Sequence, residues 1–278
     1  MIGATAVDLP APASLRALRA RILNWYAANA RDLPWRRTTD PYAILVAEVM
    51  LQQTQVSRVA PMYGAFLARF ATLEALAAAP LAEVLGAWQG LGYNTRAVRL
   101  QRSAQAAQRR SATGPAQLPS TLEELRRLPG IGPYTARAVL VFAHNADLAA
   151  VAANVRRVLT HELELPHGLS AGALQAVADA ALPIGRARDW HNALMDYGSL
   201  VLTARVSGVA PLTHQGAFRG SRRMYRARLV RLLLERRPRT LPELAGLVGL
   251  PASEVAAIAA ELQRDGLVLL KEDLITLP

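Results

Sequence analysis

The segment at positions 125–139 constrains the fold of this chain more than any other part of its sequence. It reads Leu-Arg-Arg-Leu-Pro-Gly-Ile-Gly-Pro-Tyr-Thr-Ala-Arg-Ala-Val, which predicts a helix, a tight turn and a second helix. Gly130 and Gly132 permit positive φ angles and let another backbone approach closely. Pro133 is favoured at the first position of a helix, so the second helix is expected to begin there.

The start of that second helix is a candidate site for a phosphate group. A helix N-terminus attracts anions through its dipole and through N–H groups that have no partner inside the helix. A helix-hairpin-helix of this kind holds a DNA backbone without reading the bases. The alternative is an ordinary αα-hairpin with a glycine turn, but the complete pattern with its flanking leucines favours DNA binding.

Helical periodicity dominates residues 1–215, and no long stretch alternates with a period of two before residue 266. We therefore predict an all-α body with short connections. Helices are expected at 14–29, 42–58, 61–70, 72–78, 81–88 and 95–110, another begins at the capping box 120–123, and loops cover 31–41 and 90–94.

A small C-terminal module follows a linker at 211–220 that is rich in turn-forming residues. Its helices are expected at 222–236, from the capping box 240–243 onward, and at 253–264, and two strands at 266–270 and 274–277 surround a turn. Three helices and a terminal hairpin predict a winged-helix-like α+β module. Such a module either grips DNA or packs against the main body.

The charge of the chain indicates a polyanionic partner. Its 278 residues include 32 Lys and Arg against 21 Asp and Glu, a formal net charge of +11. An excess of this size points to nucleic acid first and to an acidic membrane surface second. Lys271 is the only lysine, and arginine suits bidentate contact with phosphate, although a GC-rich genome also favours arginine.

Cysteine is absent from the sequence. This excludes disulfides, thiolate zinc sites and iron–sulfur clusters, and the five histidines lack the spacing of metal ligands, so no metal site is expected. The first ten residues lack a basic start and an apolar core of signal-peptide length. The most apolar tract, 139–155, is interrupted by polar residues, so we expect a cytoplasmic, nucleoid-associated protein.

Glu48 is the strongest candidate for a catalytic acid. It lies in the segment Glu-Val-Met-Leu-Gln-Gln-Thr-Gln-Val at 48–56, where apolar residues recur at helical spacing. Burial disfavours the charged form of a carboxyl group, and a carboxylic acid that stays protonated near neutrality can donate a proton. The alternative is a partly exposed acid on an amphipathic helix.

Seven motifs of this chain occur in the order that they have in a known enzyme family. They are Leu33-Pro-Trp-Arg36, Asp40-Pro-Tyr42, Glu48 to Val56, Gly90-Leu-Gly-Tyr93, Leu128 to Ala138, Asn154-Val-Arg-Arg-Val158 and Met195-Asp-Tyr-Gly198. Together they resemble the adenine DNA glycosylase branch of the helix-hairpin-helix base-excision DNA glycosylases, in its cysteine-free subgroup. The resemblance covers residues 20–205 approximately.

This resemblance implies a two-subdomain helix-hairpin-helix glycosylase fold over residues 1–215 and a winged-helix-like module over 216–278. The six-helix subdomain would cover about 42–150, and the second subdomain would combine the N-terminal helix with 151–210. In this family a cleft receives a nucleotide that is flipped out of double-stranded DNA, and the enzyme cuts the bond between base and sugar. The protein is expected to act as a monomer.

The resemblance also implies roles for individual residues. Glu48 would protonate the adenine leaving group and then help water attack the sugar. Gln52 and Gln53 would contact the opened helix and the orphan base, and Tyr93 would be the aromatic wedge beside the lesion strand. Alternatively, Tyr93 is a core aromatic and the glutamines are solvated.

Further residues are assigned by the same resemblance. The DNA-contacting positions beyond the wedge are Gly130, Gly132, Thr135, Asn154 and Arg157. Trp35 and Trp88 are expected in the core rather than as platforms for bases. Asp196 belongs to a helix-packing motif, and the arginine segment 218–223 either packs locally, contacts phosphate or is a solvated linker.

Ala152 is the main departure from the family pattern. The family carries a catalytic carboxylate two residues before the Asn-Val-Arg-Arg segment, and Ala152 occupies that position here. The carboxylate faces the positive charge that grows on the sugar, so its loss should cost several kcal/mol of transition-state stabilisation. Three explanations are open: an engineered inactivation, a natural slow or non-catalytic homologue, or a relocated acid such as Asp147.

Tyr134 is the second departure that concerns catalysis. Relatives with lyase activity have lysine at this hairpin position, which forms a Schiff base with the sugar. A monofunctional glycosylase without strand nicking is therefore expected. Tyrosine at this position also resembles thymine-mismatch glycosylases, which keeps a thymine or uracil substrate open.

The implied cofactors are few. No iron–sulfur cluster is expected, and the hairpin could hold a monovalent cation through backbone carbonyl groups. The leading function is removal of adenine opposite guanine or 8-oxoguanine in base excision repair. The alternatives are a thymine or uracil mismatch glycosylase and a catalytically silent protein that binds mismatched or distorted DNA.

Overall fold

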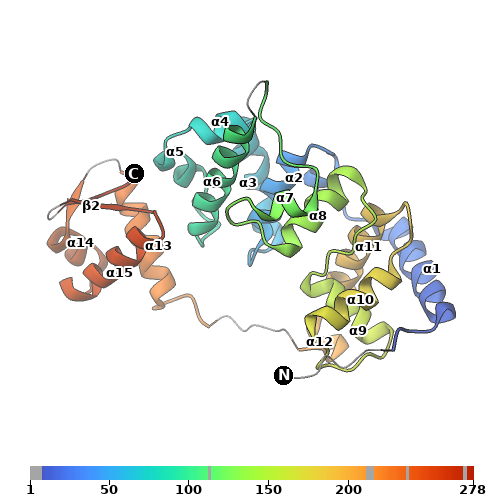
Figure 1. The fold of residues 1–278 in the computed structure, drawn as a ribbon. Helices are drawn as coiled ribbons and strands as arrows, with labels where there is room; N and C mark the ends of the chain where they lie inside the picture. Colours follow the sequence, from blue (N-terminus) through green and yellow to red (C-terminus); the bar gives the residue numbers. More distant parts are fainter. Residues whose placement is uncertain (1–7, 112–113, 211–215, 236–237, 272–273) are drawn as a thin grey trace, which may run out of the picture. The chain divides into compact units, whose positions relative to one another are not determined.

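The structure is a computed structural model that describes residues 8–111, 114–210, 216–235, 238–271 and 274–278. The chain divides into two compact units, each assembled from segments that are distant in sequence. Unit 1 comprises Met1–Leu45, Ser120–Glu123 and Gly132–His214, and unit 2 comprises Val46–Pro119, Glu124–Ile131 and Gln215–Pro278. The segment that follows the glycine turn thus groups with the N-terminal helix. Figure 1 labels the elements.

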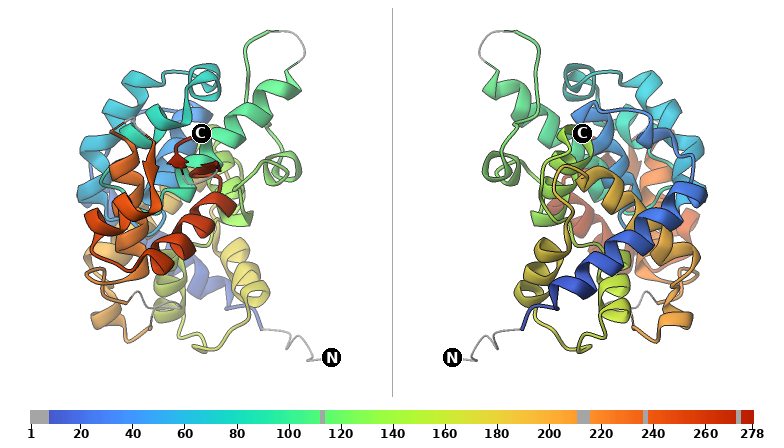
Figure 2. Two further views of the ribbon diagram at one scale, coloured as in Figure 1. Left: turned by 90° about the vertical axis from the view of Figure 1, so that its left-hand side faces the viewer. Right: turned by 90° about the vertical axis from the view of Figure 1, so that its right-hand side faces the viewer.

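Unit 1 is a bundle of helices around one hydrophobic core. Helix α1 packs along α11, which also contacts α8 and α9, and α10 packs against α1 and α9. The bounds are α1 (Pro12–Asn29), η1 (Pro34–Arg36), α8 (Pro133–His144), α9 (Ala153–Glu162), α10 (Ala171–Ala181), α11 (Ala187–Leu200) and α12 (Ala204–Ser207). Leu15, Leu18 and Ile22 follow one face of α1 and enter a core that includes Trp190 and Val158. Figure 2 shows α1 in blue from its outer side.

The helical part of unit 2 packs around α6. Helices α4 and α5 lie against α6, and the rings of Phe66 and Trp88 meet edge-on with centroids 5.7 Å apart. Trp88 is fully buried, which confirms its predicted place in the core, whereas Trp35 of unit 1 is only half-buried. The helices that lie wholly in this unit are α3 (Val56–Arg69), α4 (Leu73–Ala78), α5 (Leu81–Ala87) and α6 (Thr95–Arg110), and those that lie partly in it are α2 (Pro41–Leu51) and α7 (Leu122–Arg126).

The single helix predicted over 42–58 is wrong. The structure ends α2 at Leu51 and starts α3 at Val56, and residues 52–55 form a turn between the two helices. Gln53 has a φ of 57°, in the left-handed region that ends a helix. The new helix then runs through Pro61, which the sequence had suggested as a separate start.

The C-terminal part of unit 2 is a module of three helices and a small sheet. The elements follow the order α13 (Arg222–Leu233), β1 (Arg239–Thr240), α14 (Leu241–Val248), α15 (Ala252–Arg264), β2 (Leu269–Lys271) and β3 (Leu274–Thr276). The strands form an antiparallel sheet in the order β1-β3-β2, in which Ile275 pairs with both Arg239 and Leu270. The predicted capping box is present, because Thr240 and Glu243 bond each other's backbone N–H.

The all-α prediction for the body and the α+β prediction for the module are confirmed in the described part of the chain. The sequence missed β1, because two residues are too short to show a period. The predicted linker falls partly on 211–215, outside the described residues.

Across the described residues, we find no individual helix with both the length and the hydropathy required to traverse a membrane. The helices Leu241–Val248 and Ala252–Arg264, which meet at 106°, reach these limits only when they are counted as one span.

Candidate active site

Glu48 is buried within an apolar stretch of α2. Its side chain is 7% exposed, and the neighbouring Val49 and Met50 are buried as well. A proton-donating carboxyl group at this position is expected to be shielded, and the structure confirms the burial of Glu48. The shielding comes from the fold and places an acid where water has little access.

The two glutamines that follow lie on the turn between α2 and α3 rather than on a helix. Gln52 is half-buried and Gln53 is exposed. Gln53 has a left-handed backbone, so the two amides belong to a turn and not to a continuous helix. Their proposed contacts with the opened duplex stay a prediction.

Arg96 stabilises this turn through hydrogen bonds to backbone carbonyl groups. Its guanidinium donates to the carbonyl oxygens of Val49, Met50 and Gln52 at 2.8, 2.9 and 2.5 Å. The carbonyl groups of Val49 and Met50 are among those that the end of α2 leaves without helical partners, so the cation also opposes the helix dipole. Burial lowers the pKa of Arg96 to about 10, so it remains charged at neutral pH.

The same guanidinium holds the loop at 90–94. It donates to the carbonyl oxygens of Leu91 and Gly92 at 3.0 Å each and to Thr54 Oγ1 at 3.0 Å. Gly90 and Gly92 have positive φ angles of 93° and 70°, as a tight loop requires. One buried arginine therefore joins the turn after Glu48 to the loop that carries Tyr93.

Tyr93 is half-buried, in contact with arginines rather than with the apolar core. Its backbone has a φ of 48°, which is rare for a bulky residue and marks a conformation imposed by the surrounding loop. The Arg96 guanidinium carbon lies 5.5 Å from its ring centroid and that of Arg223 lies 5.2 Å away. Arg223 also donates a hydrogen bond to the phenol oxygen of Tyr93.

Arg222 and Arg223, which end the arginine segment 218–223 and begin α13, are thus not part of a solvated linker. Arg223 contacts Tyr93, while Arg222 pairs with Glu261 of α15 at 2.7 Å. Arg226 pairs with Glu261 at 3.0 Å. Of the alternatives that the sequence left open, local packing is the one that these contacts support.

Gly130 uses the positive φ that glycine permits, whereas Gly132 does not. Gly130 has a φ of 78°, and a Cβ at this position would lie 2.6 Å from Cβ of Arg99. Gly132 has a φ of −83°, which any residue adopts, and its Cβ would meet no atom within 4 Å. Gly132 therefore does not use the positive φ that glycine permits, because this residue is the extended N-cap of α8. Gly132 therefore differs from other residues at this position only in its lack of a side chain.

Helix α8 begins at Pro133, as predicted. Gly132 caps it without a side-chain hydrogen bond, and its carbonyl accepts from the N–H of Ala136 at 3.0 Å. Tyr134, the hairpin position that bears on catalysis, is half-buried, whereas Thr135, the predicted DNA contact, is only 3% exposed.

Ala152 occupies the N-cap of α9. Its φ and ψ are −87° and 172°, its carbonyl accepts from the N–H of Arg156 at 2.8 Å, and it has no side chain to cap the helix. Aspartate is among the best N-cap residues and alanine is among the worst. The missing carboxylate is thus also a missing helix cap.

Asp147, the suggested replacement acid, is used in a loop contact. It is exposed, and its carboxylate accepts a hydrogen bond of 2.7 Å from the N–H of Gly185. The loop that leads to Ala152 is also bound by His191, whose Nε2 accepts from the N–H of Ala150 at 2.8 Å. Its Nδ1 then donates to the carbonyl of Ala187 at 2.7 Å. Burial lowers the pKa of His191, which favours this neutral form.

The Asn-Val-Arg-Arg motif joins α9 to α11. Asn154 donates to the carbonyl of Met195 at 3.2 Å, and Arg157 donates to the carbonyl of Gly198 at 3.1 Å and to Asn154. A Cβ on Gly198 would lie 2.9 Å from Cβ of Asn154. These contacts explain why both motifs are needed for packing, whereas DNA contacts by Asn154 and Arg157 stay a prediction.

Asp196 joins α11 to the segment after α1. It is fully buried and accepts hydrogen bonds from Arg31 Nε at 2.6 Å and from both terminal nitrogens of Arg36 at 2.7 and 2.8 Å. Burial alone would raise its pKa, but the bonds from Arg36 and Arg31 bring the pKa below its usual value. These contacts support the predicted structural role of Asp196.

Metal ligands are not grouped in the described segments. No set of three or more His, Cys, Asp or Glu side chains there could hold a metal ion. In the hairpin, the carbonyl of Leu128 accepts from the N–H of Ile131 at 3.2 Å and that of Pro129 accepts from Ser103 Oγ at 2.5 Å. Each carbonyl oxygen keeps a second lone pair that suits a cation.

The sequence is similar to a protein family and to several relatives. The family described as HhH-GPD superfamily base excision DNA repair protein matches residues 46–169. Adenine DNA glycosylase from Mycolicibacterium smegmatis is 44% identical over 201 residues, which cover 69% of this chain and 67% of that protein. Adenine DNA glycosylase from Mycobacterium tuberculosis is 41% identical, and this chain spans 64% of its length. The human one is 36% identical, and the chain spans 37% of it.

Solved structures show the same fold. A thermostable thymine-DNA glycosylase is 28% identical with a TM-score of 0.64, and the match covers 69% of this chain and 89% of that one. An endonuclease III in a trapped DNA complex is 19% identical with a TM-score of 0.62, covering 72% and 90%. The second similarity concerns the fold alone.

Proposed function

Because the chain belongs to the HhH-GPD superfamily of base excision DNA repair proteins, we propose that it is a monofunctional DNA N-glycosylase that removes mispaired adenine. The partner base is guanine or 8-oxoguanine in double-stranded DNA. The observation that carries this proposal is the 44% identity to a relative named adenine DNA glycosylase, and the burial of Glu48, to which the sequence motifs assign the role of the acid, supports it.

Glu48 is assigned the proton transfers. Its protonated carboxyl gives a proton to the departing adenine as the bond between the base nitrogen and C1′ of the sugar breaks, and the base keeps the electron pair. The resulting carboxylate then takes a proton from water as the water oxygen bonds to C1′. Low exposure of Glu48 supports this role, because a shielded carboxyl group is easier to keep protonated.

The alanine at position 152 is proposed to slow this reaction rather than to change it. A carboxylate at the N-cap of α9 would stabilise the positive charge on the sugar. Its absence is consistent with a slow enzyme or a non-catalytic homologue, and the bond between Asp147 and Gly185 argues against a relocated acid.

Thymine or uracil opposite guanine is the second candidate substrate. Two observations favour it: Tyr134 at the hairpin, and the thymine-DNA glycosylase structure that matches 69% of this chain. A third possibility, a silent binder of distorted DNA, follows from Ala152 alone.

Base release from three duplexes tests these proposals. The full chain is mixed in excess with duplexes that carry adenine opposite 8-oxoguanine, thymine opposite guanine or uracil opposite guanine, and the products are treated with alkali. Cleavage of the adenine duplex alone supports the leading proposal, and cleavage of a pyrimidine duplex alone replaces it. Binding without cleavage of any duplex identifies a non-catalytic protein.

Several further assignments accompany this function. We propose that the protein acts as a monomer near the nucleoid, without an iron–sulfur cluster because the chain lacks cysteine, and with a monovalent cation at the hairpin carbonyls. The division into a glycosylase domain at 1–215 and a winged-helix-like module at 216–278 is proposed on the same basis. Loss of base release on replacing potassium with a bulky organic cation at constant ionic strength would support the cation.

A further inference from the structure

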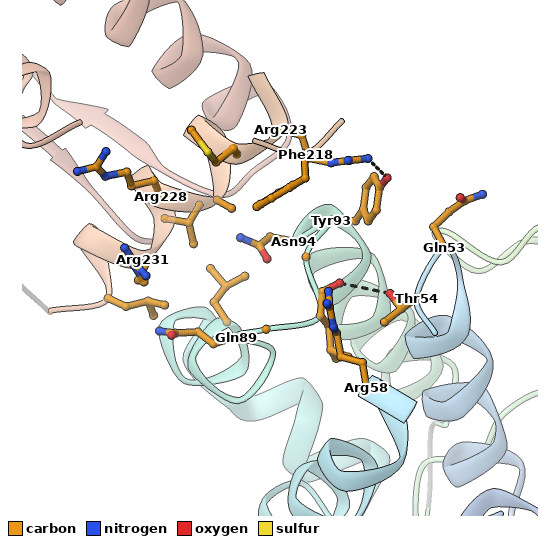
Figure 3. A pocket seen from close by; sticks show the side chains of 18 of the residues that line it. Gln53, Thr54, Arg58, Gln89, Tyr93, Asn94, Phe218, Arg223, Arg228 and Arg231 are labelled. Carbon is orange, nitrogen blue, oxygen red and sulfur yellow. Dashed lines mark hydrogen bonds between the residues drawn. The ribbon is translucent and has the colours of Figure 1, made fainter. Parts of the chain in front are cut away.

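A large cavity lies inside unit 2, between the loop at 90–94 and helix α13 of the C-terminal module. Its volume is about 870 Å³. Figure 3 shows side chains that line it. One wall comes from the turn after α2, the start of α3 and the loop with Tyr93, and the other comes from Phe218 and one face of α13. Ligand pockets for molecules of nucleotide size have volumes in this range.

The lining has the chemistry of a nucleotide site. Four arginines line it, and no acidic side chain is among the described residues that do so. The arginines are Arg58, Arg223, Arg228 and Arg231. Apolar residues also line the cavity, together with the aromatic rings of Tyr93 and Phe218 and the amide side chains of Gln53, Gln55, Gln89 and Asn94.

The four arginines differ in what they already bind. Arg223 bonds Tyr93, and Arg228 donates to the carbonyls of Leu247 and Val248 at 2.6 and 3.1 Å. The side chains of Arg58 and Arg231 have no hydrogen bond or ion pair to any described residue, and both are exposed. Two fixed arginines therefore build the wall, and two more have their donors available to a ligand.

The amides are available in the same way. Within the described ranges, the side chains of Gln89 and Asn94 make no hydrogen bond, although Asn94 is the N-cap of α6. An amide presents both a donor and an acceptor, which a base edge can match and a bare phosphate cannot use fully. The combination of unbonded amides and guanidinium groups around one concave space favours a ligand that carries both a base and a phosphate.

We propose that this cavity binds one unstacked nucleotide of a DNA strand. Arg58 and Arg231 hold its phosphate, Gln89 and Asn94 bond the base edge, and the exposed ring of Phe218 offers a stacking face. The site is separate from the proton-donating residue Glu48, which does not line it. The inference rests on the proposed function only in that the protein must bind DNA.

The C-terminal module would then have a defined task. Arg223 fixes the module to the tip of the Tyr93 loop, so neither part forms the cavity alone. Like charges gathered in a concave wall repel one another and focus a positive potential into the space, which an anionic ligand relieves. Four arginines of the chain are thus gathered where a nucleotide can enter.

Binding of the full chain to two fluorescein-labelled duplexes tests this proposal. One duplex is fully paired, and the other has the same strands with one additional, extrahelical nucleotide. The cavity variant is Arg58→Gln with Arg231→Gln, and the matched control is Arg109→Gln with Arg264→Gln, which removes two exposed charges outside the cavity. A second variant, Gln89→Ala with Asn94→Ala, leaves the charge unchanged.

The measured quantity is the ratio of the two dissociation constants. We expect the preference for the extrahelical nucleotide to fall about tenfold in the cavity and amide variants and to stay constant in the control. Any preference for the extrahelical nucleotide that arises at Glu48 is the same in the wild type and in all variants, so it does not affect the comparison of their ratios. If the preference falls in the arginine variant alone, the cavity makes only a phosphate contact, and the proposal is overturned. Equal ratios of the dissociation constants in all variants would also overturn it.

The same titrations separate this inference from the proposed function. Failure to bind either duplex would overturn both. Tight binding of the paired duplex without any preference in the wild-type chain would overturn the nucleotide site alone and leave base release to be judged by the glycosylase assay.

Discussion

Arg96 donates a hydrogen bond of 2.9 Å to the carbonyl oxygen of Met50, and this contact joins helix α6 to the end of the helix that carries Glu48. The same guanidinium bonds the loop before Tyr93. Two segments with separate predicted roles, proton donation and duplex opening, are therefore held by one buried cation.

Replacing Arg96 with methionine is expected to destabilise the protein by about 3 kcal/mol or more, because several buried carbonyl groups lose their donor together. The free energy of unfolding in urea measures this. Arg109→Met, an exposed change near the end of the same helix, should stay within about 0.5 kcal/mol of the wild type. Equal midpoints for both variants would contradict the role of Arg96.

Glu48→Gln is expected to lower the rate of base release by at least about 10³-fold, since an amide cannot donate the proton or accept one from water. Duplex affinity should change less than about twofold, because the substitution is isosteric and buried. Single-turnover base release and fluorescence anisotropy measure the two quantities. Substantial base release in the variant would show that Glu48 is not the acid.

Ala152→Asp is expected to raise the rate of base release by about 100-fold, because it returns a carboxylate beside the developing charge on the sugar. It should also stabilise the protein by about 1 kcal/mol, because aspartate caps α9. Ala152→Asn is the matched control: it caps the helix without a charge, so it should add stability but not rate. A rate that rises equally with asparagine would assign the effect to capping.

The hairpin glycines are expected to respond differently to alanine. Gly130→Ala should cost about 2 kcal/mol, because it combines a positive φ with a close approach to Arg99. Gly132→Ala has room for its methyl group, so its cost should stay below about 1 kcal/mol. If Gly132 admits a DNA phosphate, its variant should instead lose duplex affinity. Thermal unfolding and duplex titration distinguish the two effects.

Stability is expected to decline as pH falls through the range in which histidine titrates. His191 has a lowered pKa in the folded state. Below the unfolded value of about 6.5 the unfolded chain takes up the proton first, so folding loses stability until the folded pKa is passed. Urea unfolding at about pH 7.5 and 5.5 should show a smaller pH dependence in His191→Gln than in the wild type. Identical slopes would contradict this assignment.

Much of the site could be predicted from the sequence because its signals are local. The apolar neighbours of Glu48 predict burial, and Pro133 marks the start of α8 through its own ring geometry. The break after Leu51 was missed, because Gln52 to Gln55 are compatible with a helix and the interaction that ends it comes from Arg96. No pattern in a single segment reveals such a partner.

The contacts of the C-terminal module could not be predicted from the sequence for the same reason. Arg223 is 130 residues from Tyr93, and a cluster of arginines in a linker is usually solvated. A pattern search could have noted the aromatic Phe218 beside these arginines, but not the ring that they meet.

What the sequence determined by itself was the helical body, the glycine turn, the shielding of residue 48 and the missing acid at residue 152, because each depends on side-chain pattern or identity within a few positions. Only the tertiary structure decided that Arg96 ends α2, that Asn154 and Gly198 pack together, and that α13 closes a cavity with the Tyr93 loop. These features depend on groups distant in sequence, whose approach is set by the packing of whole helices.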